Sequence, residues 1–217
     1  MVGARSQLVD PPRVADVHYL LLGIGLGIGA GLAPGPLLAL VITTSLARGF
    51  GAGLRVAFSP LITDSIMIAV SVLLVRALPS RAAGALGVVG GLYVVWLGIE
   101  SVRELPVVVE TDDGPDPLRR GALVNLLSPH PWLFWLTVGG SVVVSAWQEA
   151  PPAAVGFLVA FFVALIGTKA IVAAIVSSGR RALTERGLQR AHRLAGAFLL
   201  LTGVLLTVGF GSQLLTP

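Results

Sequence analysis

The sequence predicts an all-α membrane protein with six transmembrane helices arranged as two inverted repeats of three helices. The chain of 217 residues is 55% hydrophobic and only 12% charged, whereas soluble domains are typically about 25% charged. Its mean hydropathy is +0.89. The apolar residues gather into six continuous stretches, and each is long enough for a helix to cross a bilayer core of about 30 Å. Strands are disfavoured because the stretches do not alternate and a lone strand leaves its backbone unsatisfied in lipid.

The six stretches and the polar segments between them define the organisation of the chain. The apolar stretches cover residues 19–46, 54–75, 83–99, 121–146, 153–176 and 194–215. We divide the chain into a polar N-terminal segment (1–17), a first three-span repeat (18–104), an acidic linker (105–117) and a second three-span repeat (118–217). Because each half has an odd number of spans, the second half is inverted relative to the first.

The distribution of arginine predicts the orientation in the membrane. Six spans place two groups of arginines on opposite sides: Arg5, Arg13, Arg76 and Arg81 on one, and Arg48, Arg55, Arg103, Arg119, Arg120, Arg180, Arg181, Arg186, Arg190 and Arg193 on the other. Basic residues favour the cytoplasmic side of a membrane protein. We therefore expect a multi-pass protein of the cytoplasmic membrane with both termini outside.

Two Pro-x-Pro motifs interrupt the first and fourth stretches, at Pro34-Gly35-Pro36 and at Pro129-His130-Pro131. Proline donates no backbone hydrogen bond and clashes with the preceding turn, so each motif should break its helix. The break leaves free carbonyls before it and a helix N-terminus after it, which suits a carboxylate. Matched breaks in inverted halves are typical of a transporter binding site, and the alternative is a kink packed by neighbouring helices.

Asp64 and Lys169 place opposite charges deep in the second and fifth stretches, and Lys169 is the only lysine of the chain. A charge near the bilayer centre is costly, so each needs a partner or a wet cavity. The two are each other's obvious partners. One hypothesis is a structural ion pair that joins the halves. The other is a functional pair, in which Asp64 takes a proton or a substrate amine and Lys169 holds a carboxylate.

Asn125 and His130 are the polar residues of the interrupted fourth stretch. Asn125 is expected to satisfy carbonyls near the break or to bind substrate. His130 is a candidate proton relay because histidine titrates near neutral pH, or else a hydrogen-bonded spacer. The expected substrate or proton pathway comprises Pro34, Gly35, Pro36, Asp64, Asn125, Pro129, His130, Pro131 and Lys169.

Several other functions lack sequence support. The chain has no cysteine, no G-x-x-x-x-G-K-[ST] phosphate loop and no His/Glu cluster, so we expect no enzyme activity, cofactor or metal. We expect no nucleic-acid partner either, since the arginines lie between apolar runs. Glycines alternate over residues 23–31 but follow no predicted strand, and we interpret them as helix-packing positions rather than a dinucleotide loop.

The motifs resemble, in order and spacing, those of the LysE (lysine exporter) family of amino-acid translocators. They are Ala33-Pro34-Gly35-Pro36, then Arg48-Gly49 with Gly53, Pro60-Leu61-Ile62-Thr63-Asp64, Val124-Asn125-Leu126-Leu127-Ser128-Pro129, which is similar to the family's N-x-x-[NS]-P element, and Gly167-Thr168-Lys169. The last is similar to a lysine-bearing fifth span found in one branch. The resemblance covers about residues 20 to 210.

The resemblance implies secondary export of amino acids or related small metabolites, driven by an ion gradient, by a protein that is often a homodimer. Two departures argue against a basic substrate: Pro60 stands where many members carry a small or aliphatic residue, and His130 where many carry lysine.

We therefore expect a proton-coupled exporter of amino acids or related small metabolites in the lipid bilayer. The alternative is a membrane scaffold or an enzyme in envelope lipid assembly. An enzyme should carry a second acid or nucleophile at depth beside Asp64. A scaffold should lose little when Asp64 or Lys169 is neutralised.

Overall fold

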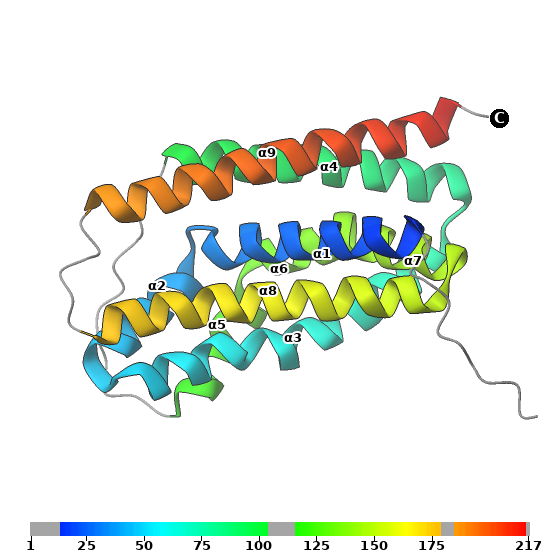
Figure 1. Cartoon of the computed structure of the whole chain (residues 1–217). Helices are drawn as coiled ribbons and strands as arrows, with labels where there is room; N and C mark the ends of the chain where they lie inside the picture. Colours follow the sequence, from blue (N-terminus) through cyan, green and yellow to red (C-terminus); the bar gives the residue numbers. More distant parts are fainter. Residues whose placement is uncertain (1–13, 104–115, 179–184, 216–217) are drawn as a thin grey trace, which may run out of the picture.

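The computed structural model describes residues 14–103, 116–178 and 185–215 (Figure 1). Every element in these ranges is helical, which confirms the all-α class. The helices are α1 (Val14–Leu32), α2 (Pro36–Arg48), α3 (Phe50–Ala77), α4 (Ser80–Arg103), α5 (Pro117–Leu127), α6 (Pro129–Phe134), the π-helix η1 (Trp135–Gly139), α7 (Gly140–Glu149), α8 (Pro151–Ser177) and α9 (Glu185–Leu215). The acidic linker predicted at 105–117 lies almost wholly outside the described residues.

Proline and glycine set most of the helix boundaries. Pro36, Pro117, Pro129 and Pro151 each stand at the start of a helix. The first N–H groups of a helix have no acceptor within it, so proline sacrifices no hydrogen bond there. Gly49 ends α2 with a φ of 81°, a conformation that glycine adopts readily, and α3 begins at the next residue.

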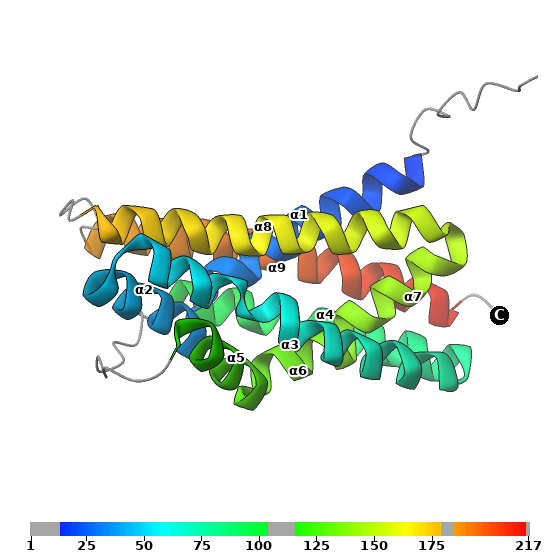
Figure 2. The same ribbon diagram turned by 90° about the horizontal axis from the view of Figure 1, so that it is seen from below.

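The long helices lie side by side along one axis (Figures 1 and 2). The α2–α3 junction, the end of α4, the start of α5, the end of α8 and the start of α9 meet at one end of the bundle. The start of α1, the α3–α4 junction, the α7–α8 junction and the end of α9 meet at the other. Successive long helices therefore run in opposite directions.

Three helical segments are long and apolar enough to cross a membrane: α3, Arg81–Ile99 of α4, and α8. Val17–Leu32 and Pro36–Arg48 together make a fourth candidate. Within the described residues, α9 contributes only the shorter apolar helix Leu199–Ser212, and α5 to α7 are interrupted at Ser128. The count of six spans therefore stays a prediction.

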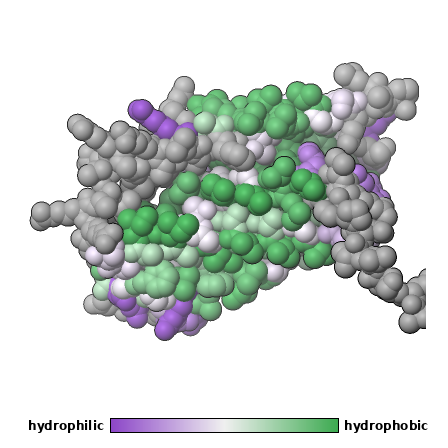
Figure 3. Space-filling view, in the orientation of Figure 1, coloured by the Kyte–Doolittle hydropathy of each residue, from purple (hydrophilic) through white to green (hydrophobic). Residues whose placement is uncertain are grey.

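The outside of the bundle is rich in apolar side chains, as the face in Figure 3 shows. Exposed examples from three helices are Leu61, Ile62, Leu73, Val159, Val163, Ile171, Leu205 and Val208. An apolar surface of this extent is unfavourable in water and suits the hydrocarbon core of a bilayer. The bundle is therefore a membrane domain.

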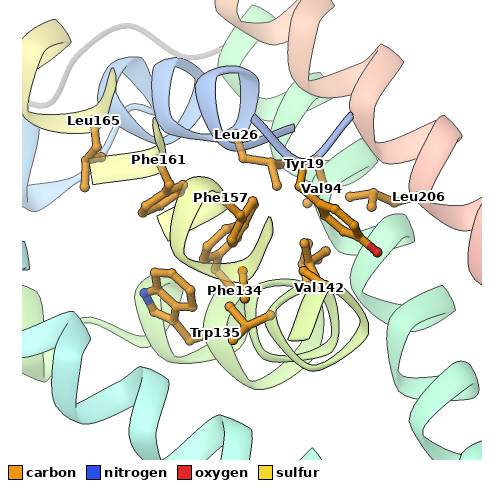
Figure 4. Close-up of a cluster of buried hydrophobic side chains, with 14 of the residues drawn as sticks. Tyr19, Leu26, Val94, Phe134, Trp135, Val142, Phe157, Phe161, Leu165 and Leu206 are labelled. Carbon is orange, nitrogen blue, oxygen red and sulfur yellow. The ribbon is translucent and has the colours of Figure 1, made fainter. Parts of the chain in front are cut away.

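The interior holds a cluster of aromatic and aliphatic side chains from both halves of the chain (Figure 4). The rings of Trp135 and Phe161 meet edge to face with their centroids 5.1 Å apart, and Phe134 stacks on Phe161 at 5.4 Å. Such ring geometries are favourable beyond the apolar area that they bury. The cluster fixes α6 and η1 against α8, beside the candidate site.

Glycines bring α1 and α8 into close contact. A Cβ atom on Gly23 would meet the backbone oxygen of Phe157, and one on Gly27 would meet that of Phe161. Gly31, one turn further, lies against Thr168. The spacing of four residues places all three on one face, which confirms the interpretation of the glycines as packing positions.

Gly27→Leu is expected to destabilise the fold by about 1–3 kcal/mol, because the added atoms have no space against the α8 backbone. The control is Gly167→Ala, since a Cβ there meets nothing within 4 Å and alanine favours a helix by about 0.5–1 kcal/mol. Thermal unfolding in detergent measures both. Equal melting temperatures for the two variants would contradict the packing role.

Candidate functional site

The first Pro-x-Pro motif lies at the junction of α1 and α2. α1 ends at Leu32, α2 begins at Pro36, and the two helices are bent by 65°. Pro34 and Pro36 lack the N–H groups that would bond to the carbonyls of Ala30 and Leu32. Those carbonyls lie at the C-terminal end of α1, where the last carbonyls of a helix have no partner within it.

The second interruption differs in position from the prediction. α5 ends at Leu127, Ser128 is extended with φ −76° and ψ 132°, and α6 begins at Pro129. The second Pro-x-Pro motif therefore forms the first turn of α6 instead of lying across the break. The physical reason is that first-turn residues need no acceptor for their N–H groups, so two prolines are tolerated there.

A cavity of about 120 Å³ lies between the two interruptions, α3 and α8. One water needs only about 10–15 Å³, so the cavity has room for a small molecule. The predicted site residues that line it are Pro34, Gly35, Pro36, Asp64, Asn125, His130, Pro131 and Lys169. Pro129 is exposed and does not line it. The structure thus brings eight of the nine predicted residues to one place.

Asp64 is held by a buried polar cluster. The side-chain amide of Asn125 donates to Asp64 Oδ1 at 2.6 Å and to Thr63 Oγ1 at 2.7 Å. All three side chains are only 4% exposed. Because Asn125 belongs to α5 and Asp64 to α3, these hydrogen bonds join the two halves of the chain. Asn125 therefore orients the carboxylate instead of satisfying a carbonyl at the break.

The α3 helix continues through Pro60, close to Asp64. Proline at this position leaves the carbonyl of Val56 without its usual N–H partner. The hydroxyl of Ser59 donates to that carbonyl at 2.7 Å. The substitute bond keeps α3 helical and lets Pro60 form part of the cavity wall.

Lys169 finds its partner in the backbone of α1. Its ammonium, 3% exposed, donates to the carbonyl of Gly31 at 3.1 Å. Gly31 lies in the last turn of α1, where carbonyls point out of the helix and carry partial negative charge. Asp64 and Lys169, both in described helices, line the same cavity without forming the ion pair that the sequence suggests.

His130 is fixed by two aromatic residues of α4. The hydroxyl of Tyr93 is 3.1 Å from His130 Nδ1, and the ring of Trp96 lies nearly parallel to the imidazole with the centroids 6.1 Å apart. Tyr93 and Trp96 were not among the predicted site residues. Their spacing of three residues places them on one helix face, but nothing in the sequence indicates that this face meets α6.

Trp135 is a wall residue that was not among the predicted site residues. It begins the π-helix η1 and is fully buried. Its indole N–H faces the carboxyl group of Asp64, and among the described residues it is the one buried side-chain polar atom without a hydrogen bond of regular geometry. The nitrogen points away from the aromatic cluster (Figure 4), and the ring lines the cavity. A π-helix is uncommon and often accompanies a functional site.

The cavity has two electrically distinct sides. Lys169 and the N-terminus of α2, which carries partial positive charge, supply one side. The carboxylate of Asp64 supplies the other. This arrangement can bind a small molecule that bears both a negative and a positive group.

Comparison with known proteins places the chain in a family. Residues 28–210 match the family model described as LysE type translocator. Neither the curated proteins nor the solved structures give a match. The matched segment contains both interruptions and every residue that lines the cavity. It covers most of the chain, which therefore belongs to the LysE type translocator family of transmembrane transporters.

Proposed function

We propose that this protein is a secondary transporter that exports amino acids or related small metabolites across the cytoplasmic membrane in exchange for protons. Membership in the translocator family supports transport of small molecules. The observation that carries the site assignment is the cavity between the two helix interruptions, where Asp64, Asn125 and Lys169 meet the N-terminus of α2. Substrate binding and proton exchange are assigned to this cavity.

The proposed architecture has six spans in two inverted repeats. In it, α1 with α2 forms one broken span, and α5 to α7 form its counterpart. The packing supports this: α1 lies mainly against α8 of the other half, while α3 lies against α5 and η1. α4 pairs with α9. Exchanging the two halves maps these contacts onto one another, as an inverted repeat requires.

The proposed orientation places the α2–α3 junction in the cytoplasm and both termini outside. Arg48 at the end of α2, Arg55 early in α3, and Arg119 and Arg120 in the first turn of α5 lie at that end of the bundle (Figure 1). Arg76 in the last turn of α3 lies at the opposite end. The bias supports a cytoplasmic assignment by the positive-inside rule.

Competition at Asp64 explains how export couples to protons. Towards the cytoplasm, an ionised Asp64 holds the substrate amine. Towards the outside, a proton displaces the amine and remains on the carboxyl until the site faces inward again. His130 stays a candidate relay for this proton, since Tyr93 contacts Nδ1 and leaves Nε2 for a second partner.

Two finer assignments accompany this proposal. One is membership in the branch with a lysine in the fifth span, which the position of Lys169 on the cavity supports. The other is the homodimer that the family resemblance implies. No observation favours the alternative of a lipid-assembly scaffold or enzyme: among the described residues, Asp64 is the only acid that lines the cavity.

Cysteines introduced at Ser178 and Gln148 are expected to react with a membrane-impermeant thiol reagent from opposite sides. Ser178 follows α8 at the arginine-rich end, and Gln148 lies in the last turns of α7 at the other end. The unmodified chain has no cysteine, so it serves as the unlabelled control. Intact cells and inverted vesicles distinguish the sides. Labelling of both cysteines from one side would contradict six spans.

Replacing both Pro34 and Pro36 with alanine is expected to abolish export while the protein still folds. Alanine supplies the missing N–H groups, so α1 and α2 can join and close the α2 N-terminus that lines the cavity. The measurement is efflux from preloaded vesicles, with the folded amount determined by size-exclusion chromatography. Pro151→Ala, at an exposed helix start away from the cavity, is the control. Normal efflux by the double variant would favour the packed-kink hypothesis.

Asp64→Asn combined with Lys169→Met is expected to give a folded protein without proton-driven flux. The two residues have separate partners, so removing both charges leaves no unpaired charge at depth but removes the proposed proton and substrate groups. Flux in reconstituted vesicles under an imposed proton gradient is the readout. Recovery of the unmodified flux in the double variant would assign the two residues a structural role only.

A further inference from the structure

We infer that the substrate is a zwitterionic amino acid with an apolar side chain, of which leucine is the test case. This inference rests on the proposed exporter function and narrows its substrate class. The cavity provides one site for a carboxylate and one for an amine, and the rest of its wall is mainly apolar.

The carboxylate site combines Lys169 with the first turn of α2. An ammonium group has three N–H donors, and Lys169 donates one of them to the carbonyl of Gly31. The N–H groups of Leu37 and Leu38 begin α2, no side chain caps this helix, and both residues line the cavity. These donors suit the carboxylate of a ligand.

The amine site is the Asp64 carboxylate. Asn125 and Thr63 both direct their hydrogen bonds to Oδ1. These bonds leave Oδ2 as an acceptor for a ligand. Because Asp64 and Lys169 are both nearly fully buried and not paired with each other, a ligand that carries both charges compensates both at once.

The rest of the wall sets the choice of side chain. It consists mainly of Ala30, Leu97, Phe134, Phe161 and Leu165. Once Asp64 and Lys169 hold the amine and carboxylate of the ligand, the polar residues left on the wall are Asn125, Ser128 and His130. Asn125 already donates to Asp64, Ser128 donates to the carbonyl of Val124, and Tyr93 contacts His130 Nδ1. A charged or hydroxylated ligand side chain would lose more hydrogen bonds to water there than these few groups can replace. An apolar side chain gains from the same surface.

The test is counterflow into reconstituted vesicles with radiolabelled leucine, lysine, glutamate and serine. Leucine flux is expected to exceed that of each other amino acid by about tenfold or more, the ratio that one well-placed interaction gives. Leucine methyl ester, which lacks the carboxylate, and 4-methylpentanoate, which lacks the amine, are expected not to compete. Competition by either compound as strong as that of leucine would overturn the two-site assignment.

A wall variant tests the apolar remainder. Leu97→Ala removes apolar surface from the cavity and is expected to raise the half-saturating leucine concentration severalfold. Leu92→Ala is the matched control, since Leu92 belongs to the same helix and is 56% exposed. Equal half-saturation in the two variants would overturn the wall assignment.

Failure of the inference and failure of the proposed function give different results. Lysine, glutamate or serine flux that exceeds leucine flux and is lost in Asp64→Asn would overturn the apolar-substrate inference and leave export standing. Absence of flux for all four amino acids in a folded, reconstituted protein would overturn both.

Discussion

Every backbone N–H and C=O group at membrane depth needs a hydrogen-bond partner, and the centre of this protein is organised around the places where a helix ends or where proline removes a donor. The carbonyl of Gly31 before the first interruption accepts from Lys169, and the carbonyl of Val56 before Pro60 accepts from Ser59. At the second interruption, Ser128 donates to the carbonyl of Val124 at 2.6 Å. A polar side chain thus supports each of these three carbonyls, and two of the side chains, Lys169 and Ser128, line the cavity. The polar character of the site is a consequence of breaking helices inside an apolar bundle.

Close packing makes the first of these bonds possible. Lys169 reaches Gly31 only because α1 lies near enough to α8, and that distance depends on glycines that leave no Cβ between the helices. Gly31 itself lies against Thr168, the residue before Lys169. The glycine face and the buried lysine are therefore parts of one arrangement: the first sets the separation of the helices, and the second uses it. Leucine at Gly27 would act on the site through this separation as well as on the stability of the fold.

Hydropathy, proline and glycine in the sequence predicted where the helices lie, because these features act locally. The convergence of Asp64, Asn125 and Lys169 was predicted as well, since charged side chains at membrane depth need polar partners and the two halves of the chain resemble each other. Their partners were not, because a hydrogen bond depends on tertiary geometry: Asp64 bonds to Asn125, and Lys169 to a backbone carbonyl. The second interruption also falls before its motif, since the first turn of a helix tolerates proline. Tyr93, Trp96 and Trp135 could not be identified as site residues from the sequence because aromatic residues are common in apolar runs.

The separation of Asp64 from Lys169 bears on transport itself. A direct ion pair would satisfy both charges within the protein, and a substrate would have to break it before binding. Here each charge is supported by a neutral group, the amide of Asn125 or the carbonyl of Gly31, so each keeps hydrogen-bonding capacity towards the cavity. The two supports also come from different interruptions, since Asn125 precedes the second and Gly31 the first. A ligand that bridges Asp64 and Lys169 therefore links the two interrupted helices mechanically. On the proposed function, that link gives substrate binding a direct means of changing how the halves of the protein lie against each other.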